Sequence, residues 1–275
     1  MHELGRLEGQ SIRIDYRFAE NDYAALPRLA TELVDSGVDL IVAAPTPAVA
    51  AARDATKTIP VVMIAAIDPV GLGWVASLTR PSENLTGISF GVGVETFAKE
   101  LELLKQISPQ IRRVAVLSNT AAYPSHKFVV DTMQATAKYF GIQLLPLEVQ
   151  PNGFPDAFLL IEKQGADALI VNANVGSLPE AHRLAEFALV HHLPTVSHIR
   201  APVEAGGLMS YGPNVTDLWA RAAEYVDKIL KGAKPGDLPV EQPTRFQLLL
   251  NLKTAKALGI AIPLSVQAQA DHMIE

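Results

Sequence analysis

Short apolar runs rich in β-branched residues recur along the chain, and longer amphipathic segments separate them. Runs that are apolar at almost every position, such as residues 39–44 and 60–67, are typical of strands covered by helices on both faces of a sheet. Residues 11–17 alternate apolar and polar positions, which is also a strand pattern. The predicted strands are residues 11–17, 39–44, 60–67, 113–117, 143–149, 168–171, 195–197, 208–211 and 246–250.

Apolar residues spaced three and four apart predict helices between these strands. In residues 24–36, for example, Leu26, Leu29 and Leu33 share one face, and Gly37 ends the pattern. The other predicted helices are residues 96–107, 125–140, 178–191 and 216–230. The alternation of strand and helix predicts an α/β fold of repeated βαβ units with mainly parallel sheets.

The βαβ pattern occurs twice, in residues 11–89 and again in residues 111–210. Elements that follow the second copy indicate that the chain crosses between lobes more than once, as in a multi-strand hinge. We therefore expect two Rossmann-like lobes, an N-terminal one and a C-terminal one, with a cleft between them that suits a small ligand. Their expected extents are residues 1–90 plus 211–235, and residues 91–210 plus 236–275.

The composition narrows the class of function. Hydrophobic residues make up 49% and charged residues 19% of the 275 residues, enough to bury a sizeable core. The net charge is −6 and no basic stripe exists, which argues against a nucleic-acid partner. The absence of cysteine excludes disulfides, thiolate metal sites and a cysteine nucleophile. No apolar run reaches the roughly 20 residues of a membrane span, and the sequence as given contains no signal peptide.

Two patterns suggest a cofactor or a metal, and local structure explains both better. Residues 71–76, GLGWVA, match the G-x-G-x-x-A spacing of dinucleotide-binding turns, but Pro69 interrupts the turn. His191, His192 and His198 have no carboxylate at ligand spacing, and the first two suit the C-terminal end of a helix. We therefore expect no cofactor and no metal.

Thr46 and Asp68 follow two predicted strands at their carboxyl ends, where open α/β sheets bind ligands. Thr46 stands at the start of a short helix, whose unpaired N–H groups attract a carboxylate. Thr46 is expected to contact such a ligand group, and the alternative is a plain helix cap; the two roles are compatible. Asp68 either pairs with a ligand ammonium group or begins the turn before Pro69.

Amide side chains follow strands of the second copy in the same way. Asn119 follows residues 113–117, and Asn172 and Asn174 follow residues 168–171. An amide can donate and accept without carrying charge, which suits the orientation of a polar ligand, and turn formation is the alternative. Tyr211 lies on a recrossing strand, where an aromatic ring can both stack and form a hydrogen bond.

Four segments together resemble the substrate-binding proteins of ABC-type uptake transporters, a family that includes tryptophan and tyrosine binders. They are DLIVAAPTPAVAAARDATKTIPVVM, DPVGLGWVASLTRPSENLTGIS, EAGGLMSYGPN and NLKTAKALGIAIP, in the family's order. The resemblance implies a type I periplasmic-binding fold, whose two lobes close around a small molecule such as an aromatic amino acid. It also implies a membrane permease and an ATPase as partners, and a periplasmic or lipid-anchored extracellular location.

The resemblance supports the residues singled out above and adds one. The family's T-P, D-P-V and strand-end asparagine fall on Thr46, Asp68 and Asn119, and its N-x-T-G-x-S crossing ends at Ser89. The predicted ligand site is therefore Thr46, Asp68, Ser89, Asn119, Asn174 and Tyr211.

The N-terminus departs from the resemblance. Relatives begin with a signal peptide, a first strand and a first helix, whereas this chain starts near the end of that helix, at HELGRLEGQ. The first strand of the N-terminal lobe, central in such a sheet, is therefore expected to be missing. We expect the gap to be closed by pairing of its flanking strands, filled by a partner chain in a homodimer, or supplied by an upstream extension.

Two other functions share this fold class. The ligand-sensing domain of a transcription regulator would need a helix-turn-helix module upstream, which the sequence does not contain. An α/β enzyme such as a racemase or isomerase would need paired acid–base groups in the cleft, whereas Asp68 is the one obvious acid at a cleft-facing strand end. The sequence therefore favours a transport receptor that performs no catalysis.

Overall fold

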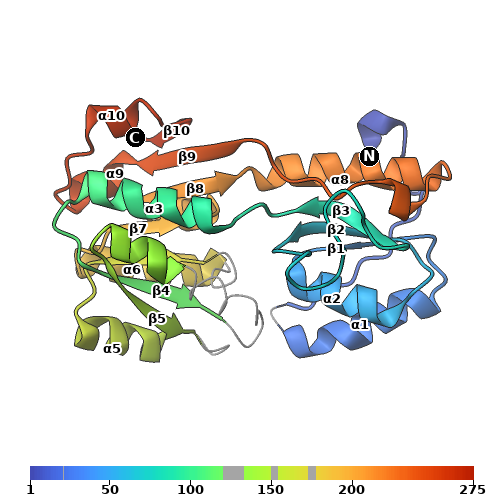
Figure 1. Cartoon of the computed structure of the whole chain (residues 1–275), viewed down its shortest axis with the longest axis horizontal. Helices are drawn as coiled ribbons and strands as arrows, with labels where there is room; N and C mark the ends of the chain where they lie inside the picture. The colour runs from blue at the N-terminus through green and yellow to red at the C-terminus, as the bar shows by residue number, and fades with distance from the viewer. Residues whose placement is uncertain (21, 120–132, 150–153, 173–177) are drawn as a thin grey trace. The chain divides into compact units, whose positions relative to one another are not determined.

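The computed structural model of the chain describes residues 1–20, 22–119, 133–149, 154–172 and 178–275. The chain forms two compact units (Figure 1), and it passes from one to the other three times. Unit 1 consists of Met1–Gly91 and Val215–Thr244, and unit 2 consists of Val92–Asn214 and Arg245–Glu275. Both are α/β units with mainly parallel sheets, which confirms the predicted fold class.

Unit 1 is built on a parallel sheet in the order β1-β2-β3. These strands are β1 (Ile41–Ala43), β2 (Val61–Ala66) and β3 (Leu85–Ser89). Helices α1 (Leu26–Asp35) and α2 (Thr46–Ala55) cover one face, and α8 (Val215–Leu230) covers the other (Figure 1). The central strand β2 is buried along nearly its whole length, as its unbroken apolar pattern predicts.

The prediction of a strand at residues 11–17 is wrong. The segment forms one isolated bridge, at Ile12, and none of the described strands pairs with it. Its apolar side chains therefore have no sheet face to join, and Tyr16 and Phe18 lie exposed with their rings stacked 5.9 Å apart. In the described part of unit 1, β1 pairs with β2 alone, so direct pairing with residues 11–17 does not extend the sheet.

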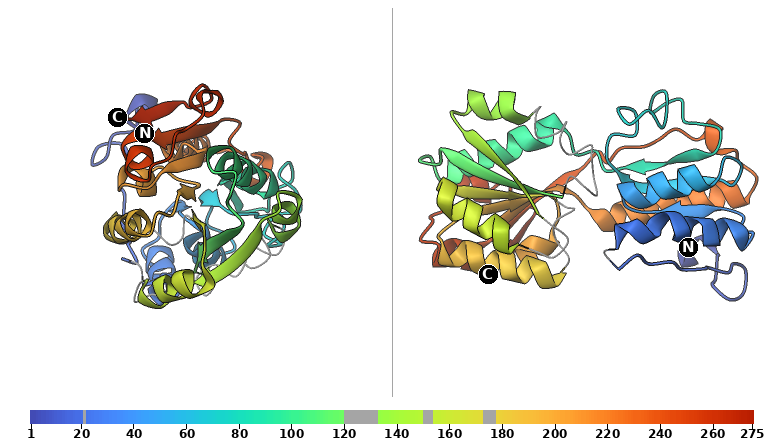
Figure 2. Two further views of the ribbon diagram at one scale, coloured as in Figure 1. Left: turned by 90° about the vertical axis from the view of Figure 1, so that its left-hand side faces the viewer. Right: turned by 90° about the horizontal axis from the view of Figure 1, so that it is seen from below.

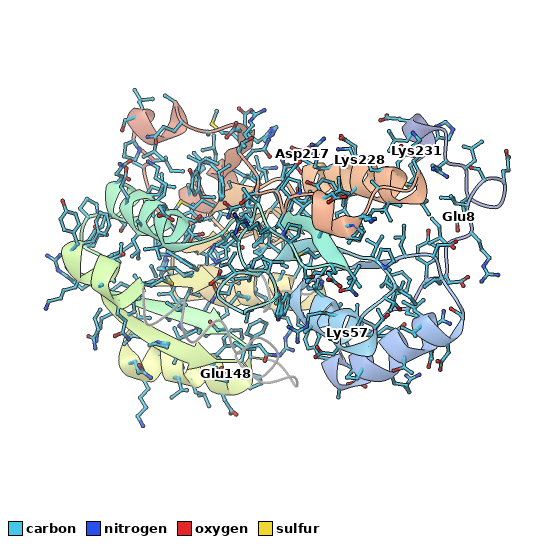
Figure 3. All side chains as sticks on the ribbon, turned by 45° about the vertical axis from the view of Figure 1, so that its right-hand side comes forward. Glu8, Lys57, Glu148, Asp217, Lys228 and Lys231 are labelled. Carbon is cyan, nitrogen blue, oxygen red and sulfur yellow. The ribbon has the colours of Figure 1, made fainter. Side chains whose placement is uncertain are left out.

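Helix α8 is strongly amphipathic. Leu218 and Tyr225 are buried on the side that packs on β2 and β3. Lys228 projects from the same helix, and Lys231 directly follows its last residue (Figure 3). Lys231 pairs with Asp227 at 2.7 Å, and the Lys228 Nζ lies 5.5 Å from the Tyr225 ring centroid. Short 3-10 turns occur at His2–Leu4, Tyr23–Ala25 and Pro235–Asp237.

Unit 2 contains a seven-stranded sheet in the order β10-β9-β8-β7-β6-β4-β5. The strands are β4 (Arg113–Ser118), β5 (Gln143–Glu148), β6 (Ala168–Val171), β7 (Thr195–Ser197), β8 (Met209–Pro213), β9 (Phe246–Asn251) and β10 (His272–Ile274). Every pair is parallel except β8 with β9. The edge strand β10 has no counterpart among the predicted strands.

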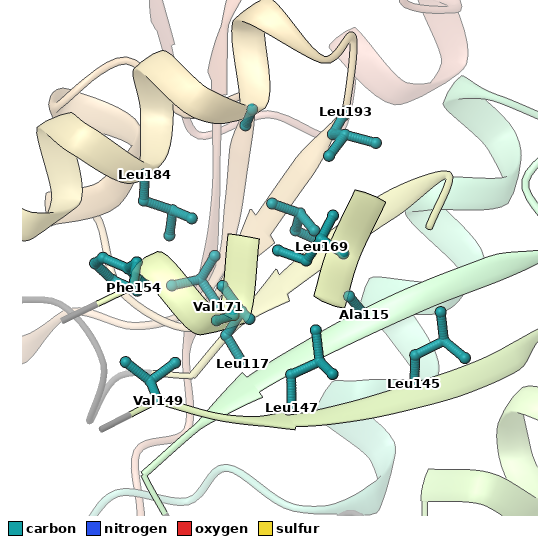
Figure 4. Close-up of a cluster of buried hydrophobic side chains, with 13 residues drawn as sticks. Ala115, Leu117, Leu145, Leu147, Val149, Phe154, Leu169, Val171, Leu184 and Leu193 are labelled. Atoms are coloured by element: carbon teal, nitrogen blue, oxygen red, sulfur yellow. The ribbon is translucent and has the colours of Figure 1, made fainter. Parts of the chain in front are cut away.

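Helices cover both faces of this sheet (Figure 2). They are α3 (Val94–Ile107), the helical residues 133–139, α5 (Pro155–Gln164), α6 (Leu178–Val190), α7 (Ala201–Glu204), α9 (Leu252–Ala257) and α10 (Leu264–Gln267). The core beneath α5 and α6 joins apolar side chains of β4, β5 and β6 to both helices (Figure 4). Three side chains of this core are completely buried, namely Leu117, Phe154 and Leu169. The core therefore holds the carboxyl ends of β4 and β6 in place.

Candidate functional site

Three of the predicted site residues lie at one edge of the unit 1 sheet. Thr46 begins α2 shortly after β1, Asp68 follows β2, and Ser89 is the last residue of β3. Because the three strands are parallel neighbours, their carboxyl ends meet at the same edge. The structure therefore brings Thr46, Asp68 and Ser89 to the part of the sheet where the sequence predicted them.

Thr46 links the start of α2 to the end of β2. Its side chain is buried, and its Oγ1 accepts a hydrogen bond from the backbone N–H of Ile67 at 3.0 Å. The residue that caps α2 is Pro45, and no side chain makes the capping hydrogen bond, so the alternative that Thr46 caps the helix is wrong. The hydroxyl satisfies a buried N–H group at the sheet edge instead.

Asp68 shapes the turn after β2. The residue has a positive φ of 42°, and its Oδ1 accepts a hydrogen bond from the Gly71 N–H at 2.8 Å. A Cβ at Gly71 would lie 2.0 Å from the Asp68 Oδ2, so any larger residue there would require the Asp68 carboxylate to move. The turn-forming alternative is thus realised, and the exposed carboxylate is also open to a ligand cation.

Ser89 ties β3 to the last part of unit 1. The Glu241 carbonyl accepts hydrogen bonds from the Ser89 backbone N–H at 2.8 Å and from its hydroxyl at 3.3 Å. The carboxylate of Glu241 in turn accepts two hydrogen bonds from Arg221 of α8. The Ser89 hydroxyl therefore has a structural partner that the sequence pattern did not indicate.

The remaining predicted residues belong to unit 2. Asn119 is buried directly after β4, and Tyr211 lies half-buried on β8 with its ring centroid 5.7 Å from that of Phe246. Strand β8 runs parallel to β7, and β4, β6 and β7 are parallel neighbours, so their carboxyl ends form one edge. Asn174 lies outside the described residues, and its role stays a prediction.

A buried chain of hydrogen bonds runs beneath this edge of unit 2. Glu100 Oε1 lies 2.6 Å from His198 Nδ1, and His198 Nε2 lies 2.8 Å from Asn172 Oδ1. Asn172 Nδ2 donates to Ser118 Oγ at 2.6 Å. The exposed fractions of Glu100, His198, Asn172 and Ser118 are 0%, 2%, 1% and 4%. Burial raises the pKa of the Glu100 carboxyl, and the nearby His198 opposes that rise.

Sequence reasoning missed most of this chain of hydrogen bonds. It weighed His198 only as a metal ligand and passed over Glu100 and Ser118, yet each had a detectable signal. Glu100 interrupts the apolar stripe of α3, and Ser118, Asn172 and His198 end or directly follow buried strands. Across the described ranges no three histidine or acidic side chains gather to hold a metal ion.

Comparison with protein families gives a match over almost the whole chain. Residues 1–274 match the family described as ABC transporter substrate binding protein. The sequence is 30% identical over 263 residues to a tyrosine-binding protein of Clostridioides difficile (strain R20291), a match that covers 94% of this chain and 74% of that protein.

Solved structures give the same picture. A conserved domain protein of Vibrio cholerae has a TM-score of 0.91 and 28% identity, with 99% of this chain and 90% of that chain covered. An ABC domain from Streptococcus pneumoniae in complex with L-Trp has a TM-score of 0.89 and 29% identity, with 97% of this chain and 89% of that chain covered.

None of the helices within the described ranges is long and apolar enough to cross a bilayer.

Proposed function

The chain belongs to the family of ABC transporter substrate-binding proteins, and we propose that its ligand is an aromatic L-amino acid. Proteins of this family bind small molecules for a membrane transporter and are not enzymes. The observation that carries the proposal is the similarity, over nearly the whole chain, to a tyrosine-binding protein and to a domain solved with L-Trp.

The chemistry of the strand ends supports an amino acid as ligand. An α-amino acid presents an ammonium group, a carboxylate and a side chain. The exposed carboxylate of Asp68 suits the ammonium group of the ligand. The Ser118 hydroxyl at the end of β4 and the Asn172 amide after β6 suit its carboxylate. The half-buried ring of Tyr211 offers a surface on which an aromatic side chain can stack.

We propose that residues of both units contact the ligand. Thr46, Asp68 and Ser89 would contribute from unit 1, and Asn119, Asn174 and Tyr211 from unit 2. The two units would then act as lobes that close on the ligand, since the chain connects them at three points. Weaker binding after substitution in either unit supports this arrangement, whereas sensitivity confined to one unit contradicts it.

The partners and location follow the family. The protein would hand its ligand to a permease powered by an ATPase, from the periplasm or from a lipid anchor outside the cell. A related Clostridium difficile structure, 29% identical with a TM-score of 0.69, is a substrate binding protein with adhesive properties, which is consistent with an exposed location for that protein. A homodimer also stays a prediction. Light scattering of the purified chain measures its oligomeric state directly.

Isothermal titration tests the ligand. The protein is unfolded, dialysed free of any co-purified molecule, refolded and titrated with L-tyrosine, L-tryptophan, L-leucine and 4-hydroxybenzoate. We expect one molecule of L-tyrosine or L-tryptophan per chain and much weaker binding of the other two. Mass spectrometry of the untreated protein provides an independent answer. A co-purifying molecule of another class, together with no binding of either aromatic amino acid, would rule the proposal out.

A further inference from the structure

The hydrogen bonds that link Glu100, His198, Asn172 and Ser118 have a defined donor-to-acceptor direction, because only some of the atoms can carry a hydrogen. The Oδ1 of Asn172 carries no hydrogen, so its contact with His198 at 2.8 Å requires a hydrogen on Nε2 of the imidazole. The 2.6 Å contact between His198 Nδ1 and Glu100 Oε1 holds one further proton between those two atoms. Both nitrogens of the imidazole are therefore used inside the protein.

The opposite direction is disfavoured by burial. If the Asn172 amide were turned round, Nε2 would be bare and Nδ1 would carry the only imidazole hydrogen. Glu100 would then be either a charged carboxylate or a carboxylic acid whose hydrogen lies on Oε2. The Glu100 carboxyl is completely buried, and its Oε2 has no hydrogen-bond partner among the described residues. An unbalanced negative charge there is costly, and a hydrogen on Oε2 would be a buried donor without an acceptor among the described residues. A hydrogen on Nε2 avoids both costs, because the proton between Nδ1 and Oε1 is then shared and the Glu100–His198 pair is neutral overall.

The direction of these hydrogen bonds determines whether the Ser118 hydroxyl accepts a hydrogen bond from Asn172 or donates one to it. The Asn172 amide is oriented by His198, and its Nδ2 donates to the Ser118 Oγ at 2.6 Å. The Ser118 oxygen is thus an acceptor toward Asn172, and its own O–H points elsewhere. Ser118 and Asn172 stand at the carboxyl ends of the neighbouring strands β4 and β6, which is the edge where parallel sheets bind ligands.

We propose that Glu100 and His198 are positioning residues of the ligand site, which act through Asn172 to hold the Ser118 hydroxyl as a donor to the carboxylate of the bound amino acid. This inference rests on the proposed function, because it names the ligand group. A hydroxyl hydrogen bond to an ionised carboxylate is stronger than one between neutral groups. Neither Glu100 nor His198 touches the ligand.

The direction of the hydrogen bonds can be tested without any ligand. Nitrogen-15 NMR of the ligand-free protein distinguishes protonated from bare imidazole nitrogens, and His198→Gln identifies the His198 signals. We expect hydrogen on Nε2 in the wild type and in Glu100→Gln, whose amide imitates a neutral carboxyl. A bare Nε2 in the wild type overturns the inference, whether or not aromatic amino acids bind.

The role of Ser118 is tested by calorimetry with L-tyrosine or L-tryptophan, whichever binds more tightly, and with the amide of that amino acid. Ser118→Ala should weaken binding of the amino acid by about 10-fold or more. It should weaken binding of the amide by a smaller factor, since a neutral carbonyl is a poorer acceptor. Equal losses for the two ligands contradict the assignment of the carboxylate.

A double-mutant cycle tests whether His198 acts through Ser118. His198→Leu should weaken binding in the wild type but have no further effect once Ser118→Ala is present, whereas His198→Gln should stay close to wild type because its Nε2 still donates to Asn172. Additive losses would show only a structural role for His198. Thermal melts check folding, and Asn172→Ala replaces His198→Leu if the latter unfolds. If the wild type binds neither amino acid, the proposed function fails, and the NMR result still decides the hydrogen-bond direction.

Discussion

The carboxylate of Glu241 accepts two hydrogen bonds from the guanidinium of Arg221, at 2.6 Å from Nε and 2.7 Å from Nη2. The backbone of Glu241 also bonds to β3, since its N–H donates to Gly87 O and its carbonyl accepts from Ser89 N–H. Arg221 therefore holds the segment that lies beside β3 of unit 1. The guanidinium also keeps the pKa of the Glu241 carboxyl below its usual value.

Arg221→Gln should lower the free energy of unfolding at neutral pH by up to about 1 kcal/mol, because both side chains are partly exposed. A carboxylate whose folded-state pKa is depressed stabilises the fold above its unfolded-state pKa, and this contribution disappears as the pH falls through the folded-state pKa. The difference from wild type should therefore shrink below about pH 4. Urea denaturation at several pH values measures it.

Arg28→Gln is the control, because Arg28 pairs with Glu32 on the exposed surface of α1. At neutral pH, Arg28→Gln should lower the free energy of unfolding by less than Arg221→Gln does. An Arg221→Gln effect that is unchanged between neutral and acidic pH would contradict the role assigned to the Glu241 charge.

Gly87→Ala should destabilise unit 1 by about 2–4 kcal/mol. Gly87 has a φ of 131° and pairs with Met63 of β2, and a Cβ there would lie 2.2 Å from the Met63 carbonyl oxygen. The close approach of the two strands leaves no room for a side chain. Chemical denaturation measures the loss, and Gly236→Ala, whose Cβ would lie 3.6 Å from Ser82 O, should change stability little.

Thr46→Val should cost about 1–3 kcal/mol of stability, because it leaves the buried N–H of Ile67 without an acceptor at nearly unchanged side-chain volume. Thr46→Ser keeps the hydroxyl and should preserve most of that stability. If Thr46 also contacts the ligand, Thr46→Val weakens binding and Thr46→Ser does so much less. Equal stability of the two variants would show that the Ile67 hydrogen bond contributes nothing.

Asp68→Asn separates the charge of Asp68 from its turn. The Asn Oδ1 can still accept the Gly71 N–H, so the turn should survive, while a ligand ammonium group would lose its charged partner. We expect both Asp68→Asn and Asp68→Ala to weaken amino-acid binding by a factor above roughly 30. Binding by Asp68→Asn within a few-fold of wild type, measured by calorimetry, would mean that Asp68 serves only its turn.

Local sequence pattern is enough to predict the fold class and the places along the chain where the candidate residues lie. Continuous apolar runs such as residues 60–67 and 168–171 predict strands buried on both faces, and β2 and β6 are buried in that way. Parallel strands bring their carboxyl ends to one edge, so the residues that follow them, such as Thr46 and Asn119, could be selected from position alone. These inferences need only local pattern and the geometry of a parallel sheet.

The hydrogen-bond partners of those residues, in contrast, depend on contacts between distant segments. Residues 11–17 have a strand pattern, yet they form no strand because, apart from the isolated bridge at Ile12, no described segment pairs with their backbone. The Ser89 hydroxyl finds its acceptor 152 residues along the chain at Glu241, and Glu100 meets His198 across 98 residues. Such partners depend on which elements pack together, and periodicity within a single segment holds no information about a contact that forms only when distant segments fold against each other.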